Sequence, residues 1–340
     1  MSNPAAQTLD KIRGLKVPNI GKIPALLKRE FLDSKTGFFM VPLVIAGLTL
    51  FAMILGLISF ELQFADEIDL DLGKFQVTVD GETFTDDAFG DDIDKENFGH
   101  ILGRAVSGAT SAGIFMILPF VVFFGLLSSL YSDRRDRSYL FWKSMPVSDT
   151  KEVLTKLGYY AIVGPFILFA FMMVLGIIAM IVVTPFIWGH GGSAMDLLWS
   201  PTPFISMWFS LAAHYVVYAL WILPILAWLM LASAYAPKAP MIFAIVPVVA
   251  IITVEVLYNN GKTYLAEALL DRIALDYAHI MGDIIEKGKS FQGGIEVRDL
   301  TISEAFQALG ASFANAKFWV GQLFTGAFMA GAIYLRRYNV

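Results

Sequence analysis

Six long apolar segments are the feature of this sequence that most constrains its fold. Each holds about 20 mostly apolar residues, the helix length that crosses the ~30 Å hydrocarbon core of a membrane. They run approximately from Phe38 to Phe60, Ala105 to Tyr131, Leu157 to Val183, Ile205 to Leu231, Pro240 to Tyr258 and Phe318 to Leu335. Since lipid offers the backbone no hydrogen-bond partners, continuous runs of this length form helices. The sequence therefore predicts an all-α polytopic membrane protein with six transmembrane helices.

The composition also indicates a chain surrounded by lipid. Hydrophobic residues make up 56% of it and charged residues 16%, against about 45–50% and about 25% in soluble domains. A single soluble core could not bury that much apolar surface. The net charge of −5 argues against a nucleic-acid partner, and the lack of cysteine excludes disulfides and thiolate metal sites.

Lys and Arg concentrate in the connections on one side of the six-helix domain, which spans residues 38–335. These connections are the tail 1–37, the loop 132–156 and the C-terminus 336–340. Basic residues near the ends of spans stay in the cytoplasm. We therefore expect both termini to be cytoplasmic.

The opposite side carries long acidic connections. Within 62–104, apolar residues alternate around Asp80-Gly81, which predicts a β-hairpin with Val77 opposite Phe84. The connection 259–315 contains two helix-like stretches. Both connections are expected to be extracytoplasmic.

The tail ends in an amphipathic segment at about residues 20–37. Its apolar face gathers Ile23, Leu27 and Phe31. Arg29 lies on the opposite face, and Gly37 suits a C-terminal cap. We expect a helix that lies in the inner membrane interface with its basic face toward lipid headgroups. The alternative is a soluble helix bound to a partner.

The loop after the second span carries the densest signal for function. Its candidate docking residues are charged, aromatic or turn-forming: Asp133, Arg134, Arg135, Asp136, Arg137, Phe141, Trp142, Lys143 and Pro146. Asp149 and Glu152 form a capping pattern for the helix that follows. Aromatic anchors beside arginines are typical of a protein-docking surface. The alternative is an ordinary positively charged connector.

Two ionisable residues within the predicted spans, His214 and Glu255, are candidates for a transport pathway. Each has a simpler interpretation. His214 can be a neutral, hydrogen-bonded packing residue, and Glu255 lies close enough to the end of its span to reach the interface.

No catalytic constellation is found in the sequence. The stretch from Gly282 to Ser290 ends like a phosphate-binding loop, but five residues separate its glycines where the motif has four. No His-Glu-x-x-His, Gly-x-Ser-x-Gly or calcium-loop pattern occurs. We therefore predict no enzyme activity, no metal site and no cofactor bound by this chain.

The tail helix, the six spans, the long connection before the last span and the run from Ser132 to Asp149 together resemble the type-2 permeases of ATP-binding-cassette (ABC) exporters. The most specific part is Asp-Arg followed by Leu-Phe-Trp-Lys-Ser-x-Pro-Val-Ser-Asp. In that family the loop between spans two and three carries a coupling helix that sits in a cleft of the ATPase subunit. By position, residues 132–149 correspond to this coupling region. In that family the loop before the last span, here 259–315, often dips back into the outer leaflet.

The resemblance implies an exporter permease in a bacterial inner (cytoplasmic) membrane. It implies two copies of an ABC ATPase as partners, with ATP and magnesium bound there, and a second permease copy or a paralogue. The alternative function is a membrane anchor or sensor that does not transport and whose acidic external loops bind a partner. The sequence does not identify a substrate.

Overall fold

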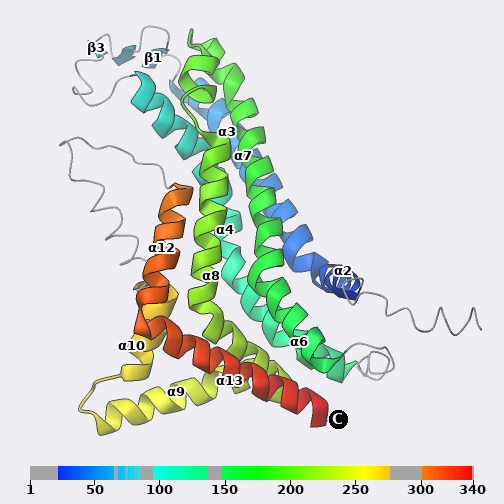
Figure 1. Ribbon diagram of the computed structural model, residues 1–340. Helices are drawn as coiled ribbons and strands as arrows, with labels where there is room; N and C mark the ends of the chain where they lie inside the picture. The colour runs from blue at the N-terminus through cyan, green and yellow to red at the C-terminus, as the bar shows by residue number, and fades with distance from the viewer. Residues whose placement is uncertain are drawn as a thin grey trace, which may run out of the picture.

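The computed structural model describes residues 22–64, 68–72, 76–79, 82–84, 95–136, 148–275 and 301–338. Within them, six helical stretches are long and apolar enough to cross a membrane. They run over Ile23–Gln63, Gly99–Arg135, Asp149–Gly189, Met195–Tyr235, Pro240–Tyr258 and Ala316–Tyr338. Each contains one of the predicted spans, so the all-α polytopic fold is confirmed (Figure 1).

Several of these stretches are built from α-helices joined end to end by short π-helical turns. The α-helices are α2 (Lys22–Lys35), α3 (Val41–Phe64), α4 (Lys95–Arg135), α6 (Asp149–Gly158), α7 (Gly164–Gly189), α8 (Phe204–Tyr235), α9 (Pro240–Tyr258), α10 (Tyr264–Leu270), α12 (Ile302–Ala314) and α13 (Ala316–Tyr338). The π-helical turns are η2 (Thr36–Met40), η4 (Tyr159–Val163), η5 (Met195–Trp199) and η6 (Asp271–Leu275).

Helix α8 lies at the centre of the bundle. Of the most apolar part of the stretch that contains α8, 56% of the residues are buried inside the protein. The corresponding share is 6% in the stretch that contains α3 and 6% in α9. It packs against α4 and α13, while α4 also packs against α7. The apolar surfaces of α3 and α9 therefore face the surrounding lipid.

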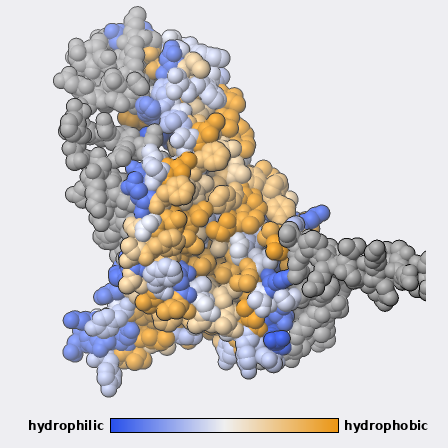
Figure 2. All heavy atoms as spheres, viewed as in Figure 1, coloured by the Kyte–Doolittle hydropathy of each residue, from blue (hydrophilic) through white to orange (hydrophobic). Residues whose placement is uncertain are grey.

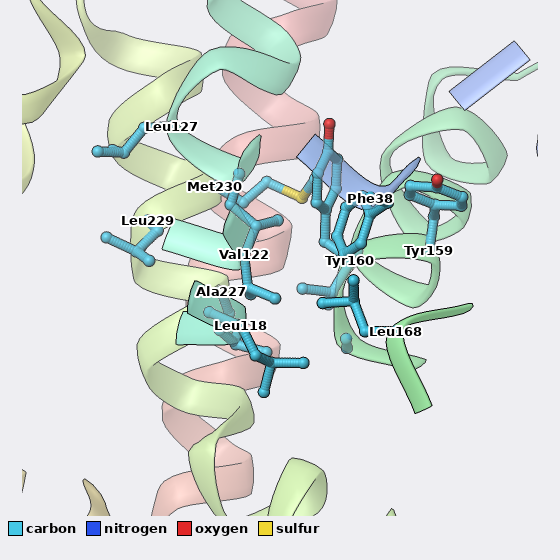
Figure 3. Close-up of a cluster of buried hydrophobic side chains, with 14 of the residues drawn as sticks. Phe38, Leu118, Val122, Leu127, Tyr159, Tyr160, Leu168, Ala227, Leu229 and Met230 are labelled. Carbon is cyan, nitrogen blue, oxygen red and sulfur yellow. The ribbon is translucent and has the colours of Figure 1, made fainter. Parts of the chain in front are cut away.

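The core lies where α4, α7 and α8 meet (Figure 3). Leu118 and Val122 of α4, Leu168 of α7 and Met230 of α8 belong to this cluster and are buried. Outside it, hydrophobic residues cover the middle of the visible face, and hydrophilic residues gather toward the ends (Figure 2). This surface pattern is the one expected of a protein that spans a bilayer.

The two π-helical turns η2 and η4 pack against each other. The ring of Phe38 in η2 lies 5.6 Å from that of Tyr159 in η4, edge to face. Phe38 is fully buried because Gly164 has no Cβ; an added one would lie 2.5 Å from the ring. Gly37 lies inside η2 rather than at a helix end, so the predicted cap at Gly37 is wrong. The packing of Phe38 therefore favours a helix that continues from α2 through η2 into α3, without a break between the tail and the first span.

The end of the bundle opposite α2 and α6 carries a small sheet (Figure 1). Strands β1 (Ile68–Asp71), β2 (Gln76–Val79) and β3 (Glu82–Phe84) pair antiparallel in that order. Val77 lies opposite Phe84, as the Asp-Gly turn predicts, whereas β1 was not predicted. The backbone of Leu72 donates to the His190 carbonyl, 3.0 Å away, which ties this sheet to the end of α7.

Helix α12 packs along α8 at the side of the bundle away from α2 and α6 (Figure 1). A capping box between Thr301 and Glu304 begins it. Its buried Ser312 accepts a hydrogen bond of 2.7 Å from Nε1 of Trp221, which is fully buried in α8. This bond anchors α12 to the central helix.

Candidate functional site

A buried cluster of six charged side chains joins four helices at one end of the bundle. Its members are Arg29 and Glu30 of α2, Asp133 of α4, Glu152 and Lys156 of α6, and Arg336 of α13. Every one of these side chains is at most 11% exposed. We call it the ion cluster. It brings the N-terminal segment, both flanks of the 132–149 loop and the C-terminal helix together.

Arg29 connects the two flanks of the loop. Its Nη2 donates to Asp133 Oδ1 at 2.8 Å, and its Nη1 donates to Glu152 Oε1 at 2.9 Å. Asp133 lies near the end of α4 and Glu152 in the first turn of α6. One guanidinium therefore holds the last turn of one helix beside the first turn of the next.

Arg336 makes the same connection from the other end of the chain. Its Nη2 lies 2.6 Å from Glu152 Oε2, and its Nη1 lies 3.4 Å from Asp133 Oδ2. Asp149, at 3.7 Å from Arg336 Nε, lies at the margin of the cluster. Both flanks of the loop are thus bound by two arginines.

Lys156 and Glu30 form the most deeply buried pair. Lys156 Nζ lies 2.9 Å from Glu30 Oε1 and donates to the Ser129 carbonyl, 3.1 Å away. It also lies 3.4 Å from Asp133 Oδ2. Glu152 and Lys156 can both face the cluster because they are four residues apart on α6 and so share a helix face.

The charges of the ion cluster balance, with three cations against three carboxylates. Burying charges is costly, and the cost is offset only when every charge is paired at close range. Removing one member leaves an uncompensated buried charge, which is strongly destabilising. The cluster therefore favours one arrangement of α2, α4, α6 and α13.

Two predicted docking residues face the protein interior instead. Asp133 is only 5% exposed and is bound within the ion cluster. Arg134 donates to the carbonyls of Ser233 and Ala236, at 2.7 and 2.9 Å, and so fastens α4 to the end of α8. Charged groups on neighbouring helices and backbone carbonyls satisfy both side chains, and direct contact of either with a partner stays a prediction.

Arg135 and Asp136 keep the surface position that docking requires. Both side chains are more than half exposed, and Arg135 Nε donates to Asp136 Oδ1 at 2.9 Å. This bond holds the pKa of the Asp136 carboxyl below its usual range. The remaining docking candidates, Arg137, Phe141, Trp142, Lys143 and Pro146, lie outside the described residues.

Helix α2 packs on the bundle in a different way from the one predicted. Leu26 is 6% exposed, Leu27 and Phe31 are half-buried against the core, and Ile23 is 45% exposed. Arg29, expected to face lipid headgroups, points into the ion cluster. The face of α2 that is buried therefore includes Arg29 and Glu30 rather than only the predicted apolar residues, because the ionic partners of Arg29 and Glu30 lie on α4 and α6.

The start of α6 also differs from the prediction. Ser148, not Asp149, is the N-cap residue, and its side chain accepts from the backbone of Lys151. Glu152 does not reach back to the cap, because Arg29 and Arg336 bind both of its oxygens. The sequence pattern located this helix start to within one residue.

The two candidate pathway residues both have structural contacts. His214 is 5% exposed in α8, and its Nδ1 donates to the Ser210 carbonyl, 2.8 Å away. Glu255 Oε2 accepts from the backbone of Leu265 at 2.9 Å, at the start of α10. These contacts favour the packing interpretation, and the pathway role of both stays a prediction.

The sequence analysis missed Glu30, Glu152, Lys156 and Arg336 as partners of one another. The signal that was available is the spacing of Glu152 and Lys156 on one helix face. It also did not include Arg104 in the second helix. The predicted span begins at Ala105, whereas α4 begins at Lys95. Among the residues that the structure describes, no group of three or more His, Asp or Glu side chains is placed to hold a metal ion.

Comparisons with known proteins identify no relative. No protein-family model matches the chain, no curated protein matches it, and no solved structure matches it.

Proposed function

We propose that this chain is the membrane subunit of an ABC exporter, working with two separate ATPase subunits and a second permease chain. In this proposal the ion cluster lies at the cytoplasmic end, and residues 132–149 dock on the ATPase. The observation that carries the proposal is the double connection between Asp133 and Glu152 through Arg29 and Arg336.

This connection suits a loop that transmits force. Because both flanks of the loop are bound by the same two arginines, a displacement of the loop would move α4 and α6 together. Arg29 and Arg336 would pass the movement on to α2 and α13. ATP-driven closure of the partner subunits could then switch the bundle as rigid bodies between two arrangements.

The test begins by finding whether a neighbouring gene encodes a soluble ATPase with a Walker A loop, and then reconstitutes this chain with that ATPase. We expect Trp142→Ala and Phe141→Ala to insert into membranes normally but to lose stimulation of ATP hydrolysis, because large aromatic anchors dominate docking interfaces. Copurification and the stimulated hydrolysis rate are measured for each variant. Tyr235→Ala removes an exposed aromatic side chain at the end of α8 and serves as the control.

Two outcomes would contradict the proposal. One is normal copurification and normal coupling in both aromatic variants. The other is the absence of any Walker A ATPase that binds this chain. Either outcome would favour the second function, a membrane anchor or sensor that does not transport.

A further inference from the structure

A cavity of about 510 Å³ lies between α4, α7 and α8, apart from the ion cluster. One face of α4 lines it with Arg104, Ser107 and Ser111. These residues share a face because they are spaced by three and four positions along the helix. Arg104 lies within the stretch Gly99–Arg135 that is long and apolar enough to cross a membrane. Arg104 lies near the start of that stretch and already has an interaction within the protein, and the five N–H donors of its guanidinium allow it to bind a further acceptor as well.

Two further hydrogen-bond donors line the same cavity. Ser111 of α4 and Trp208 of α8 are each 6% exposed. The hydroxyl of Ser111 and the indole N–H of Trp208 have no hydrogen-bond partner among the described residues. An unpaired buried donor destabilises a fold. Both donors are therefore poised to bind a group that brings acceptor oxygens.

The rest of the wall is apolar and includes Met172 of α7, Met207 of α8 and Phe115 of α4. Methionine side chains are flexible and polarisable, so they accommodate apolar chains of varied shape. On α4, Gly108 and Ala112 are exposed, and an added Cβ on Gly108 would meet no atom within 4 Å. These small residues leave the cavity open along the helix, where a ligand could enter from the bilayer.

The three helices approach closely at one point next to this cavity. A Cβ on Gly176 of α7 would lie 3.1 Å from the ring of Phe204 on α8 and 3.5 Å from Ser107 on α4. Met172 is one helical turn away from Gly176 and lines the cavity. The cavity thus lies beside a tight three-helix contact.

We propose that this cavity binds an amphipathic molecule with an anionic group. Arg104 pairs with the anionic group, Ser111 and Trp208 donate to a further oxygen acceptor, and the apolar chain lies against the methionines. Arg104 and Ser111 are two helical turns apart, about 10 Å, so the two polar groups of the ligand are separated along its length. That the molecule is the exported substrate rests on the proposed function, whereas its binding does not.

The test uses the purified full chain in detergent and two matched probes. 1-Oleoyl lysophosphatidate and 1-oleoylglycerol share an oleoyl ester, and only the first carries a phosphate. We expect the phosphate-bearing probe to bind at least about tenfold more tightly, because a charge-assisted hydrogen bond is stronger than a neutral one. Equal affinity of the wild-type protein for the two probes would overturn the proposal without any variant.

Variants then assign the contacts. Arg104→Gln should abolish the preference for phosphate, while Arg337→Gln, a change at an exposed arginine on α13, should keep it. Trp208→Phe retains an aromatic ring without the N–H and should weaken both probes. Unchanged binding of both probes by Arg104→Gln and Trp208→Phe would place the ligand elsewhere.

A steric variant tests the entrance. Gly108→Leu should block both probes, because its side chain would fill the open side of the cavity. Gly56→Leu is the control, since Gly56 on α3 also has nothing within 4 Å of an added Cβ. Equal binding by the two leucine variants would contradict an entrance at Gly108.

Two sources of such a ligand are separated by a competition arm. Displacement of lysophosphatidate by dioleoyl phosphatidate would identify a two-chain bilayer lipid, and resistance to it would identify single-chain molecules. All these measurements use the permease alone. Failure of the wild-type permease to bind the phosphate-bearing probe would therefore overturn this inference but not the exporter proposal, and failed ATPase coupling would do the reverse.

Discussion

Lys156 and Glu30 form an ion pair of 2.9 Å in which each side chain is only 3% exposed. The two residues belong to α6 and α2. Their contact fixes the N-terminal helix against the start of the third span. A tail helix that sequence patterning places in the membrane interface is in this way part of the bundle itself.

This pair predicts a strong asymmetry between single and double substitutions. Lys156→Met should cost about 3–5 kcal/mol, because it leaves Glu30 charged, buried and without its closest cation. Adding Glu30→Leu should recover most of the loss, since an apolar pair of similar volume is often tolerated. The measurement is the unfolding free energy in detergent. The exposed Asp136→Asn should cause no measurable change, and an additive double variant would contradict the interpretation.

The contact between Phe38 and Gly164 predicts an effect of a single methyl group. Gly164→Ala would place a Cβ 2.5 Å from the ring and should destabilise the protein by about 1–3 kcal/mol. Phe38→Leu in the same chain should relieve part of the clash. Gly158→Ala is the matched control, because nothing lies within 4 Å of its added Cβ. Thermal unfolding of these three variants and of the wild-type protein checks this prediction.

Membrane topology can be tested cleanly because the chain has no cysteine. Single cysteines at Lys35 and Asp136 should be protected from an impermeant thiol reagent in intact cells. Cysteines at Asp196 and Lys262 should be labelled, since the orientation predicted from the basic connections puts both outside. All four positions are exposed, so access by the reagent is not limited by burial. Labelling at position 136 from outside would invert the proposed orientation.

The bond between Trp221 and Ser312 predicts how α12 is held. Ser312→Ala leaves the fully buried Trp221 N–H without its acceptor and should cost about 1–3 kcal/mol. Hydrogen exchange over α12 should accelerate, because the helix loses its anchor on α8. Ser303→Ala, at an exposed position of the same helix, should leave exchange in the middle of α12 unchanged. Equal exchange in both variants would show that other contacts hold α12.

The sequence by itself determined the elements that depend on local patterns. The six spans follow from runs of apolar residues that no other environment would accept. The pairing of Val77 with Phe84 follows from the alternation around a tight turn, and the start of α6 was located to within one residue. Each of these features is encoded by residues that are neighbours along the chain.

Only the tertiary structure decided where the charges go. Arg29 has the same sequence signature whether it faces lipid headgroups or Glu152, which lies 123 positions away. Arg134 reads as a docking residue until the Ser233 and Ala236 carbonyls are placed beside it. The physical reason is range. Hydropathy acts through the solvent around each segment. An ion pair instead needs a charged nitrogen and a charged oxygen from two helices within about 4 Å of each other. The packing of the whole bundle decides whether they come that close.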